Sequence, residues 1–276
     1  MAYFTTTDNV NICYNIQGNG EKALLFLHGW GGNQLSFNPV IKMLKDKYRI
    51  ITYDHRGFGQ SDKPGHGYTI EHLAKDVKEL IEHLDLKDLT LVGWSMGGVT
   101  SLTYLSIYGS ARVSSAVIID VNPKVLVDDT YAHGLLNGTY TKTDAFDDLA
   151  KMSTGLINFV KEMPEKANMR LYNQEMREIF INAVVEQNEL LPCMCFWLSI
   201  CEADLRYVIP KVDVPVLFCH GGTSAYCPPE ARDYALSLFQ EVELASFSDC
   251  SHFIPIERPA EFAEAVDNFV INGIMD

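Results

Sequence analysis

A single serine stands between glycines directly after an apolar run in the stretch "TLVGWSMGGV", Thr90–Val99. Residues 93–97 fit the pattern G-x-S-x-G, in which a sharp strand-to-helix turn holds a serine hydroxyl out from the backbone. The apolar run before Ser95 and the helical pattern after it supply the context that this motif needs. The stretch therefore predicts a serine nucleophile, and the alternative is a small residue in a tight turn without chemistry.

A nucleophile that attacks a carbonyl also needs donors for the oxyanion that forms. The glycine-rich stretch "LHGWGG", Leu27–Gly32, follows the first strong core strand and can bring backbone N–H groups near Ser95. We expect the donors to be the amides of Trp30 and Met96, the latter at the start of a helix.

The general base should be a histidine in a loop after the last strand. His252, in "FSDCSHFIPIERP", has this position, and a helix bounded by a proline follows it. The sequence therefore predicts that Ser95 and His252 act together.

The elements that must position these residues alternate along the chain. We expect strands at 23–28, 49–54, 89–94, 116–120, 214–220 and 242–247, and helices near 34–47, 71–84, from 96, 229–239 and 259–271. Strands that are almost continuously hydrophobic are typical of a parallel sheet covered by helices on both faces. The pattern predicts an α/β fold.

One long segment interrupts this series. Between Pro123 and about Val212 the sequence changes to amphipathic segments rich in methionine and aromatic residues, with no convincing strand. We expect a helical insertion over residues 123–212. Its large apolar residues favour an apolar acyl or alcohol pocket, although a stripe of this kind is more often the core of the insertion. These residues are Met152, Phe159, Met163, Met176, Phe180, Met194, Phe196 and Trp197.

Composition excludes several classes of partner. The chain has 276 residues, 47% of them hydrophobic, a formal net charge of -14 and no run of lysine or arginine. Nucleic acids and anionic membranes attract clustered positive charge, so neither is expected to bind. No signal-peptide pattern and no segment of roughly 20 apolar residues is present, so we expect a cytoplasmic protein.

The seven cysteines are scattered and show no CxxC spacing, so we expect reduced thiols, no disulfide framework and no metal site. A homo-oligomer is compatible with the sequence, which does not determine the oligomeric state.

Four motifs together resemble the α/β-hydrolase fold superfamily: "HGWGG", "YDHRGFGQSD", "GWSMGG" and "SHFIPIERP", in the family's order and over nearly the whole chain. The chain looks most like the serine esterases and the cofactor-free haloperoxidase-type enzymes. The resemblance implies a mostly parallel central sheet flanked by helices, a core of residues 1–122 and 213–276, and a helical cap over residues 123–212. It implies no cofactor. It also implies structural roles for Asp54 and Arg56, which should bond to loop amides and carboxylates.

The acid of the catalytic triad departs from the family's pattern. Most members carry an aspartate after the penultimate strand, where this chain has the neutral Ser224. Some members place the acid one strand earlier, and "VIIDVNP" puts Asp120 there. We therefore expect Asp120 to orient His252 and Ser224 to have no part. Asp249, three residues before His252, is the second candidate, and its spacing favours a role in ordering the loop.

These residues lead to three hypotheses of function. The first is a serine hydrolase of carboxylesterase or lactonase type, which cleaves a small or medium ester or lactone through an acyl-enzyme on Ser95. The second keeps the same residues but uses peroxide in place of water, as a perhydrolase of the haloperoxidase type. The third is a non-catalytic ligand-binding protein on the same fold, an alternative motivated by Ser224.

Overall fold

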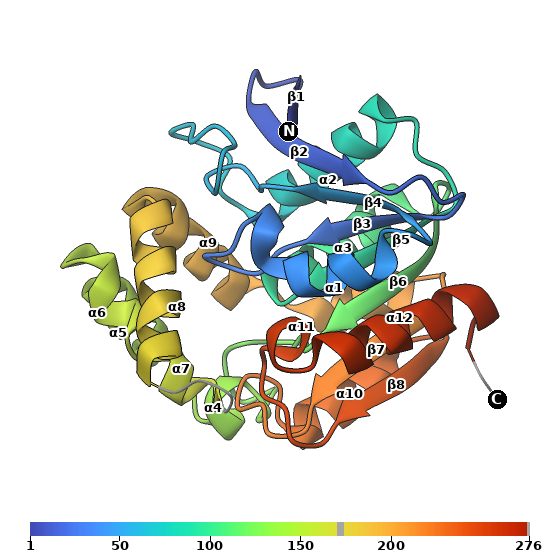
Figure 1. Cartoon of the computed structure of the whole chain (residues 1–276). Helices are drawn as coiled ribbons and strands as arrows, with labels where there is room; N and C mark the ends of the chain where they lie inside the picture. The colour runs from blue at the N-terminus through green and yellow to red at the C-terminus, as the bar shows by residue number, and fades with distance from the viewer. Residues whose placement is uncertain (170–173, 275–276) are drawn as a thin grey trace.

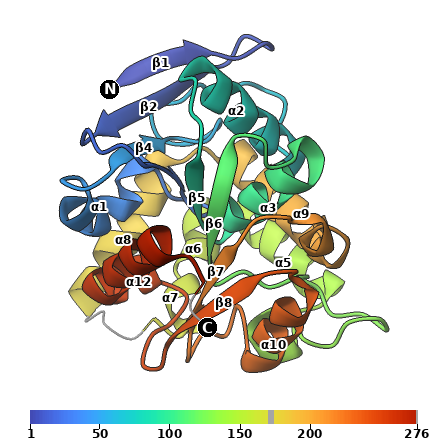
Figure 2. The same cartoon turned by 90° about the vertical axis from the view of Figure 1, so that its right-hand side faces the viewer.

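A single eight-stranded sheet forms the centre of the computed structural model, which describes residues 1–169 and 174–274 without the side chains of 174–176 (Figures 1 and 2). The strand order is β1-β2-β4-β3-β5-β6-β7-β8. The pairs β1–β2 and β2–β4 are antiparallel, and every other pair is parallel. The prediction of an α/β fold with a mostly parallel central sheet is confirmed.

The strands are β1 (Ala2–Thr5), β2 (Asn11–Gln17), β3 (Ala23–Leu27), β4 (Arg49–Tyr53), β5 (Leu89–Trp94), β6 (Val113–Ile119), β7 (Val216–Gly221) and β8 (Val242–Phe247). The helices are α1 (Asn38–Leu44), α2 (Ile70–His83), α3 (Met96–Tyr108), α4 (Leu135–Gly138), α5 (Lys142–Ser153), α6 (Leu156–Val160), α7 (Met163–Lys166), α8 (Gln174–Gln187), α9 (Leu190–Glu202), α10 (Pro229–Leu238), α11 (Ile254–Glu257) and α12 (Pro259–Asn272). Three short 3-10 helices lie at Gln34–Phe37, Leu205–Tyr207 and Ile209–Lys211.

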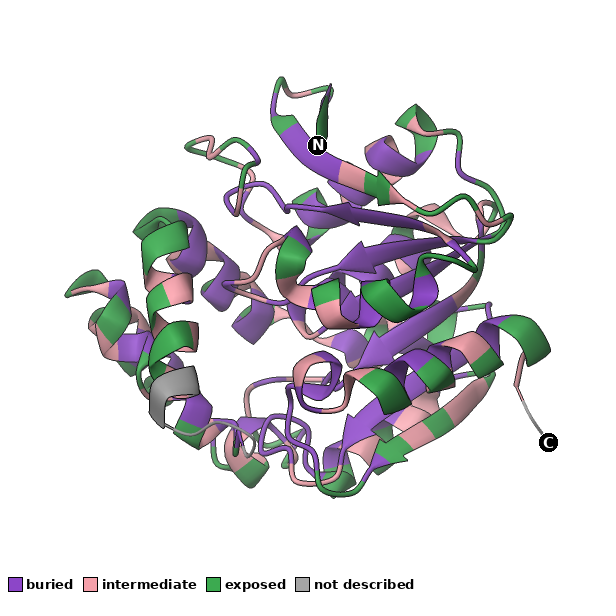
Figure 3. Cartoon of the chain, in the orientation of Figure 1, coloured by how far each residue is buried: buried purple, intermediate pink, exposed green. Residues whose placement is uncertain are grey.

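The burial of the strands explains their sequence pattern. Every residue of β3 and of β5 is buried, as a strand covered on both faces requires (Figure 3). Helices α1 and α12 pack together on one face of the sheet, and α2 packs against α3 on the other (Figure 2). The apolar runs of the sequence are therefore the central layer of the fold.

The antiparallel hairpin of β1 and β2 is absent from the sequence-based prediction. Three of the four residues of β1 are exposed, so this edge strand lacks the apolar run that marks the central strands. The predicted helix at 34–47 also divides, because a 3-10 turn capped by Asn33 comes before α1. Short or edge elements of this kind carry little periodic signal.

The segment between β6 and β7 holds α4 to α9, and its described residues contribute no strand to the sheet. Its two ends meet where the Leu205 N–H donates to the Pro123 carbonyl at 2.8 Å. Figure 1 shows α5 to α8 standing to the left of the sheet, with α9 nearer to it. The hydroxyl of Ser199 on α9 accepts from the Ile70 amide at 3.0 Å, which attaches the segment to α2. Within the described residues, no helix has the length and apolar character needed to cross a bilayer.

The loop after β4 is held by buried charges. Asp54 accepts from the backbone amides of Gln34 and Gln60 at 2.6 and 2.8 Å. The fully buried Arg56 forms hydrogen bonds to Asp76 at 2.6 Å through two nitrogens and a further ion pair with Asp8 at 2.8 Å. The expected roles of Asp54 and Arg56 in bonding loop amides and carboxylates are confirmed.

We predict that Asp76→Ala lowers the free energy of unfolding by about 3 to 5 kcal/mol, because it leaves a buried guanidinium without its main partner. Lys78→Ala on the same helix removes a surface pair with Glu82 and a cation–π contact with the Tyr108 ring, and should cost about 1 kcal/mol or less. Urea unfolding of both variants measures the difference. Equal losses would show that the Arg56–Asp76 pair contributes no more than a surface pair.

Candidate active site

Ser95 lies at the junction of β5 and α3 in a conformation that few side chains adopt. Its φ and ψ are 54° and -119°, and the residue is partly exposed. The flanking glycines are required by close packing, since a Cβ on Gly97 would lie 2.1 Å from the Leu27 carbonyl and one on Gly93 2.5 Å from the Gly97 carbonyl. This strained turn with glycines on both sides is the local geometry that the G-x-S-x-G pattern predicts.

Asp120 follows β6 and contacts the histidine chosen from the sequence. Its Oδ2 lies 2.7 Å from Nδ1 of His252, and both residues are buried. Oδ1 accepts from the Gly221 amide at 3.0 Å, and Oδ2 accepts from the Ser224 hydroxyl at 2.5 Å. A buried carboxylate needs such donors, because an unpaired charge in the interior is costly.

The loop that carries His252 is fixed at several points. The indole N–H of Trp94 donates to the His252 carbonyl at 2.9 Å. The amide and hydroxyl of Ser251 both donate to the Glu257 carboxylate at 2.8 Å. The ring of Tyr226 lies 4.9 Å from the imidazole, centroid to centroid. The imidazole is thus held by its backbone, by a carboxylate and by a neighbouring ring.

A cavity of about 310 Å³ brings the predicted residues together: Ser95, Asp120, His252, Trp30 and Met96 all line it. Most of its remaining wall is apolar and comes from both the core and the segment 123–212, including Val99, Val121, Leu135, Met163, Phe180 and Trp197. Met163, Phe180 and Trp197 are therefore wall residues, although the sequence favoured the core of the segment for a stripe of this kind. Met152, Phe159 and Phe196 are buried core residues instead, Met194 packs against the core, and the side chain of Met176 lies outside the described residues.

Trp30 and Met96 occupy positions from which a backbone amide can reach a substrate. Residues 29–32 form a tight turn closed by the Gly32 N–H and the Gly29 carbonyl at 3.1 Å, with Trp30 at its corner and Gly31 at φ 71°. Met96 is the first residue of α3, where an N–H has no acceptor within the helix. Gly29 itself packs closely on Ser95, since a Cβ there would lie 3.3 Å from the serine Cβ.

Two buried histidines support this turn. The ring of His28 lies with Nδ1 2.8 Å from the Gly29 carbonyl and accepts the His55 amide at Nε2, 3.0 Å away. The His55 ring lies with Nε2 3.1 Å from the His28 carbonyl and Nδ1 2.8 Å from the Tyr53 hydroxyl. Burial lowers the pKa of His28 to about 4 and, together with the neighbouring His28, holds the pKa of His55 well below its usual range. Both rings are therefore neutral at physiological pH, and their hydrogen bonds hold the backbone of the turn in place.

The segment 123–212 is bonded directly to the same turn. The indole N–H of Trp30 donates to the Cys193 carbonyl at 2.9 Å. The side-chain amide of Asn188, between α8 and α9, donates to the Gly31 carbonyl at 2.9 Å. These contacts connect the segment 123–212, which lines one side of the cavity, to the loop that carries Trp30, a predicted oxyanion donor.

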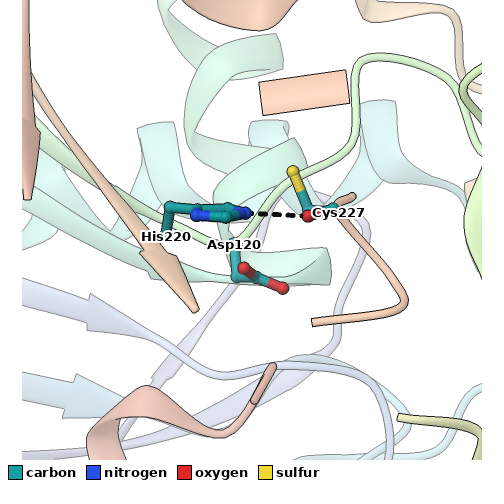
Figure 4. Close-up of side chains that lie close together, drawn as sticks. All are labelled: Asp120, His220 and Cys227. Atoms are coloured by element: carbon teal, nitrogen blue, oxygen red, sulfur yellow. Dashed lines mark hydrogen bonds between the residues drawn. The ribbon is translucent and has the colours of Figure 1, made fainter. Parts of the chain in front are cut away.

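Asp120, His220 and Cys227 form a buried group whose ligand atoms lie within 4.8 Å of one another (Figure 4). Nε2 of His220 lies 2.9 Å from the Cys227 carbonyl, and both Asp120 oxygens are engaged as described above. Burial raises the pKa of Cys227 well above its usual range, so its sulfur is a thiol. A metal would have to displace these hydrogen bonds and a proton. The three residues are therefore better explained as side chains packed behind Asp120 than as a metal site.

Asp249, the second candidate for the acid, is exposed, and its carbonyl accepts from Arg258 at 3.0 Å. Among the hydrogen bonds of the described residues, its carboxylate makes none to His252. Sequence reasoning did not identify the contacts of Trp94, Gly221 and Ser224 with the histidine and the acid. The only signal for Ser224 was its place at the family's usual acid position.

With this geometry established, the chain can be compared with known proteins. A model of the alpha/beta hydrolase fold matches residues 22–259. The chain belongs to the α/β-hydrolase fold family. The non-heme chloroperoxidase CPO-A1 of Kitasatospora aureofaciens is 35% identical to it over 92% of this chain and 93% of the relative.

Two further relatives define the branch of the family. The bifunctional esterase/perhydrolase DCH of Acinetobacter calcoaceticus is 25% identical over 92% of this chain and 94% of that protein. The solved esterase EaEST of Exiguobacterium antarcticum has a TM-score of 0.90 and 26% identity, covering 98% of this chain and 99% of its own. The resemblance to the esterase and haloperoxidase branch is thereby confirmed, and these relatives support a hydrolase.

We predict that the buried histidines make the fold sensitive to acid. The unfolded chain takes up a proton at His28 below about pH 6.5, but the folded chain does so only near pH 4. Stability should therefore fall as the pH falls through this window, by about 3 kcal/mol for His28 alone. His28→Gln keeps a donor and an acceptor without a titrating ring, so its free energy of unfolding should depend less steeply on pH. Urea unfolding between pH 7 and 4.5 tests this, and equal slopes for the two proteins would refute it.

Proposed function

We propose that this chain is a serine hydrolase that cleaves a small or medium carboxylic ester or lactone through an acyl-enzyme on Ser95. The observation that carries the proposal is the 2.7 Å contact between Asp120 Oδ2 and His252 Nδ1 at a cavity that Ser95 also lines. When Nδ1 donates its proton to Asp120, Nε2 is the basic nitrogen of the ring, as a general base for serine requires.

Each step of the proposed reaction can then be assigned to a residue of the site. Ser95 attacks the carbonyl carbon while His252 takes the hydroxyl proton, and Asp120 stabilises the imidazolium that forms. The amides of Trp30 and Met96 stabilise the oxyanion, each worth about 3 to 4 kcal/mol at the transition state. His252 returns its proton to the leaving alcohol, and water repeats the sequence on the acyl-enzyme to release the acid.

The cavity supports the class of substrate. A volume of about 310 Å³ is at the small end of ligand pockets, which suits a short or medium ester. Among the described wall residues, the acidic and basic side chains are Asp120 and His252, and the rest of the surface is largely apolar. An uncharged acyl chain fits this surface better than a highly charged one. A panel of p-nitrophenyl esters of increasing chain length, with lactones added, should show a preference for short and medium acyl groups.

A second activity is favoured by the relatives. One of them is a bifunctional esterase/perhydrolase and another a non-heme chloroperoxidase. In such a reaction hydrogen peroxide, rather than water, would attack the acyl-enzyme and release a peracid. Peracid formation from acetate and hydrogen peroxide tests it directly.

Ser95→Ala should lower the rate of ester hydrolysis by several orders of magnitude, because it removes the proposed nucleophile. It takes only one oxygen from a partly exposed site. The melting temperature should change little. A fluorophosphonate probe should label the unaltered protein and not the variant. Turnover of the variant near the original rate would exclude Ser95 as nucleophile, and absence of labelling in the unaltered protein would favour a non-catalytic binding protein.

Asp120→Asn should lower kcat by about 10⁴-fold, since an amide favours the wrong tautomer of His252 and removes the charge that stabilises imidazolium. Asp249→Asn is the matched control, because that carboxylate is exposed, and it should stay within about twofold of the unaltered rate, as expected for a residue outside the triad. If Asp249→Asn proved crippling and Asp120→Asn silent, the acid would have to be reassigned.

A further inference from the structure

Ser224 occupies a position for which the sequence predicted no role, yet its hydroxyl lies 2.5 Å from Asp120 Oδ2. This is the same oxygen that receives His252 Nδ1. Ser224 is buried, so the contact does not compete with water. The sequence-based expectation gave Ser224 no part in the site, but its side chain contacts the proposed acid directly.

The bonding of the hydroxyl leaves one direction for its proton. The backbone amides of Tyr226 and Cys227 approach the oxygen at 3.2 and 3.3 Å. A serine hydroxyl has two acceptor sites and one proton, so these two amides occupy its acceptor sites. The proton then points to the carboxylate, and Ser224 is a committed donor to Asp120.

The backbone after β7 completes the arrangement. The Ser224 amide donates to the Gly221 carbonyl at 2.9 Å, closing a turn, and the Gly221 amide donates to Asp120 Oδ1 at 3.0 Å. One turn thus supplies a donor to each oxygen of the carboxylate. Two donors on opposite oxygens prevent the carboxylate from rotating about its terminal bond and keep Oδ2 facing His252.

We infer that Ser224 is a positioning residue for the acid of this site, holding Asp120 in the orientation that His252 requires. The inference rests on the proposed serine hydrolase function. Asp120 itself is in the left-handed region at φ 51°, and the Gly221 and Ser224 donors that orient its side chain come from the turn after β7 rather than from its own strand.

The test is Ser224→Ala, with Ser61→Ala as a matched control. Ser61 is also buried, donates to the Asp54 carbonyl at 2.6 Å and accepts the Cys13 amide at 2.9 Å, outside the proposed site. For Ser224→Ala we expect kcat for the preferred ester to fall about 10- to 100-fold with KM nearly unchanged, the range for losing one hydrogen bond to a charged group. Ser61→Ala should lose stability without this loss of kcat.

A second readout does not depend on turnover. The proton between His252 Nδ1 and Asp120 should give a far-downfield proton NMR resonance, identified by its loss in Asp120→Asn. In Ser224→Ala this resonance should shift and broaden, and in Ser61→Ala it should not. If Ser224→Ala does not fold, Ser224→Cys carries the same test, because a thiol is a weaker donor than a hydroxyl.

The outcomes separate the two proposals. An active protein whose Ser224 variant keeps both kcat and the resonance of the unaltered protein would overturn the positioning role alone. An inactive, unlabelled protein whose resonance still moves in the Ser224 variant would overturn the serine hydrolase function and leave the positioning role standing.

Discussion

A buried carboxylate must be surrounded by donors, and this requirement at Asp120 organises the carboxyl edge of the sheet. Its donors are the Gly221 amide and the Ser224 hydroxyl, both in the turn after β7, and His252 in the loop after β8, so these two segments have to meet at the end of β6. They can meet because β5, β6, β7 and β8 are consecutive neighbours in the sheet. The proposed nucleophile Ser95, the proposed acid Asp120, the turn that supports it and His252 follow these four strands in that spatial order.

The same strand order explains how the proposed acid can lie after β6 while a serine lies after β7. Neighbouring strands are about 4.8 Å apart, so side chains from two adjacent strand ends can reach the same imidazole. In this chain the Ser224 hydroxyl donates a hydrogen bond to Asp120 on the neighbouring strand end. Ser224 and Asp120 are therefore linked by a direct hydrogen bond, and the role of one cannot be interpreted without the other.

The other side of the site depends on neutral hydrogen bonds. His28 bonds to the turn at Gly29, and His55 bonds to His28. Trp30 and Asn188 connect the same turn to the segment between β6 and β7. The turn that carries Trp30, a predicted oxyanion donor, is thus bonded both to the core and to the segment between β6 and β7 that lines the cavity. Two hydrogen bonds therefore connect α9 and the residues between α8 and α9 directly to this turn.

The parallel strands, and Ser95 and His252 as candidates for catalysis, could be predicted from the sequence alone, because these predictions depend on local patterns: apolar runs, glycines at fixed spacing and a histidine after the last strand. The sequence did not reveal the β1–β2 hairpin, whose edge strand is mostly exposed, and it left Asp120 and Asp249 as alternatives. Only the tertiary structure could distinguish them, because the contact between Asp120 and His252 joins residues 132 positions apart, and that of Ser224 with Asp120 joins residues 104 positions apart. Whether two such side chains meet depends on strand order and on backbone conformation at the strand ends, and neither property is encoded in the residues adjacent to them.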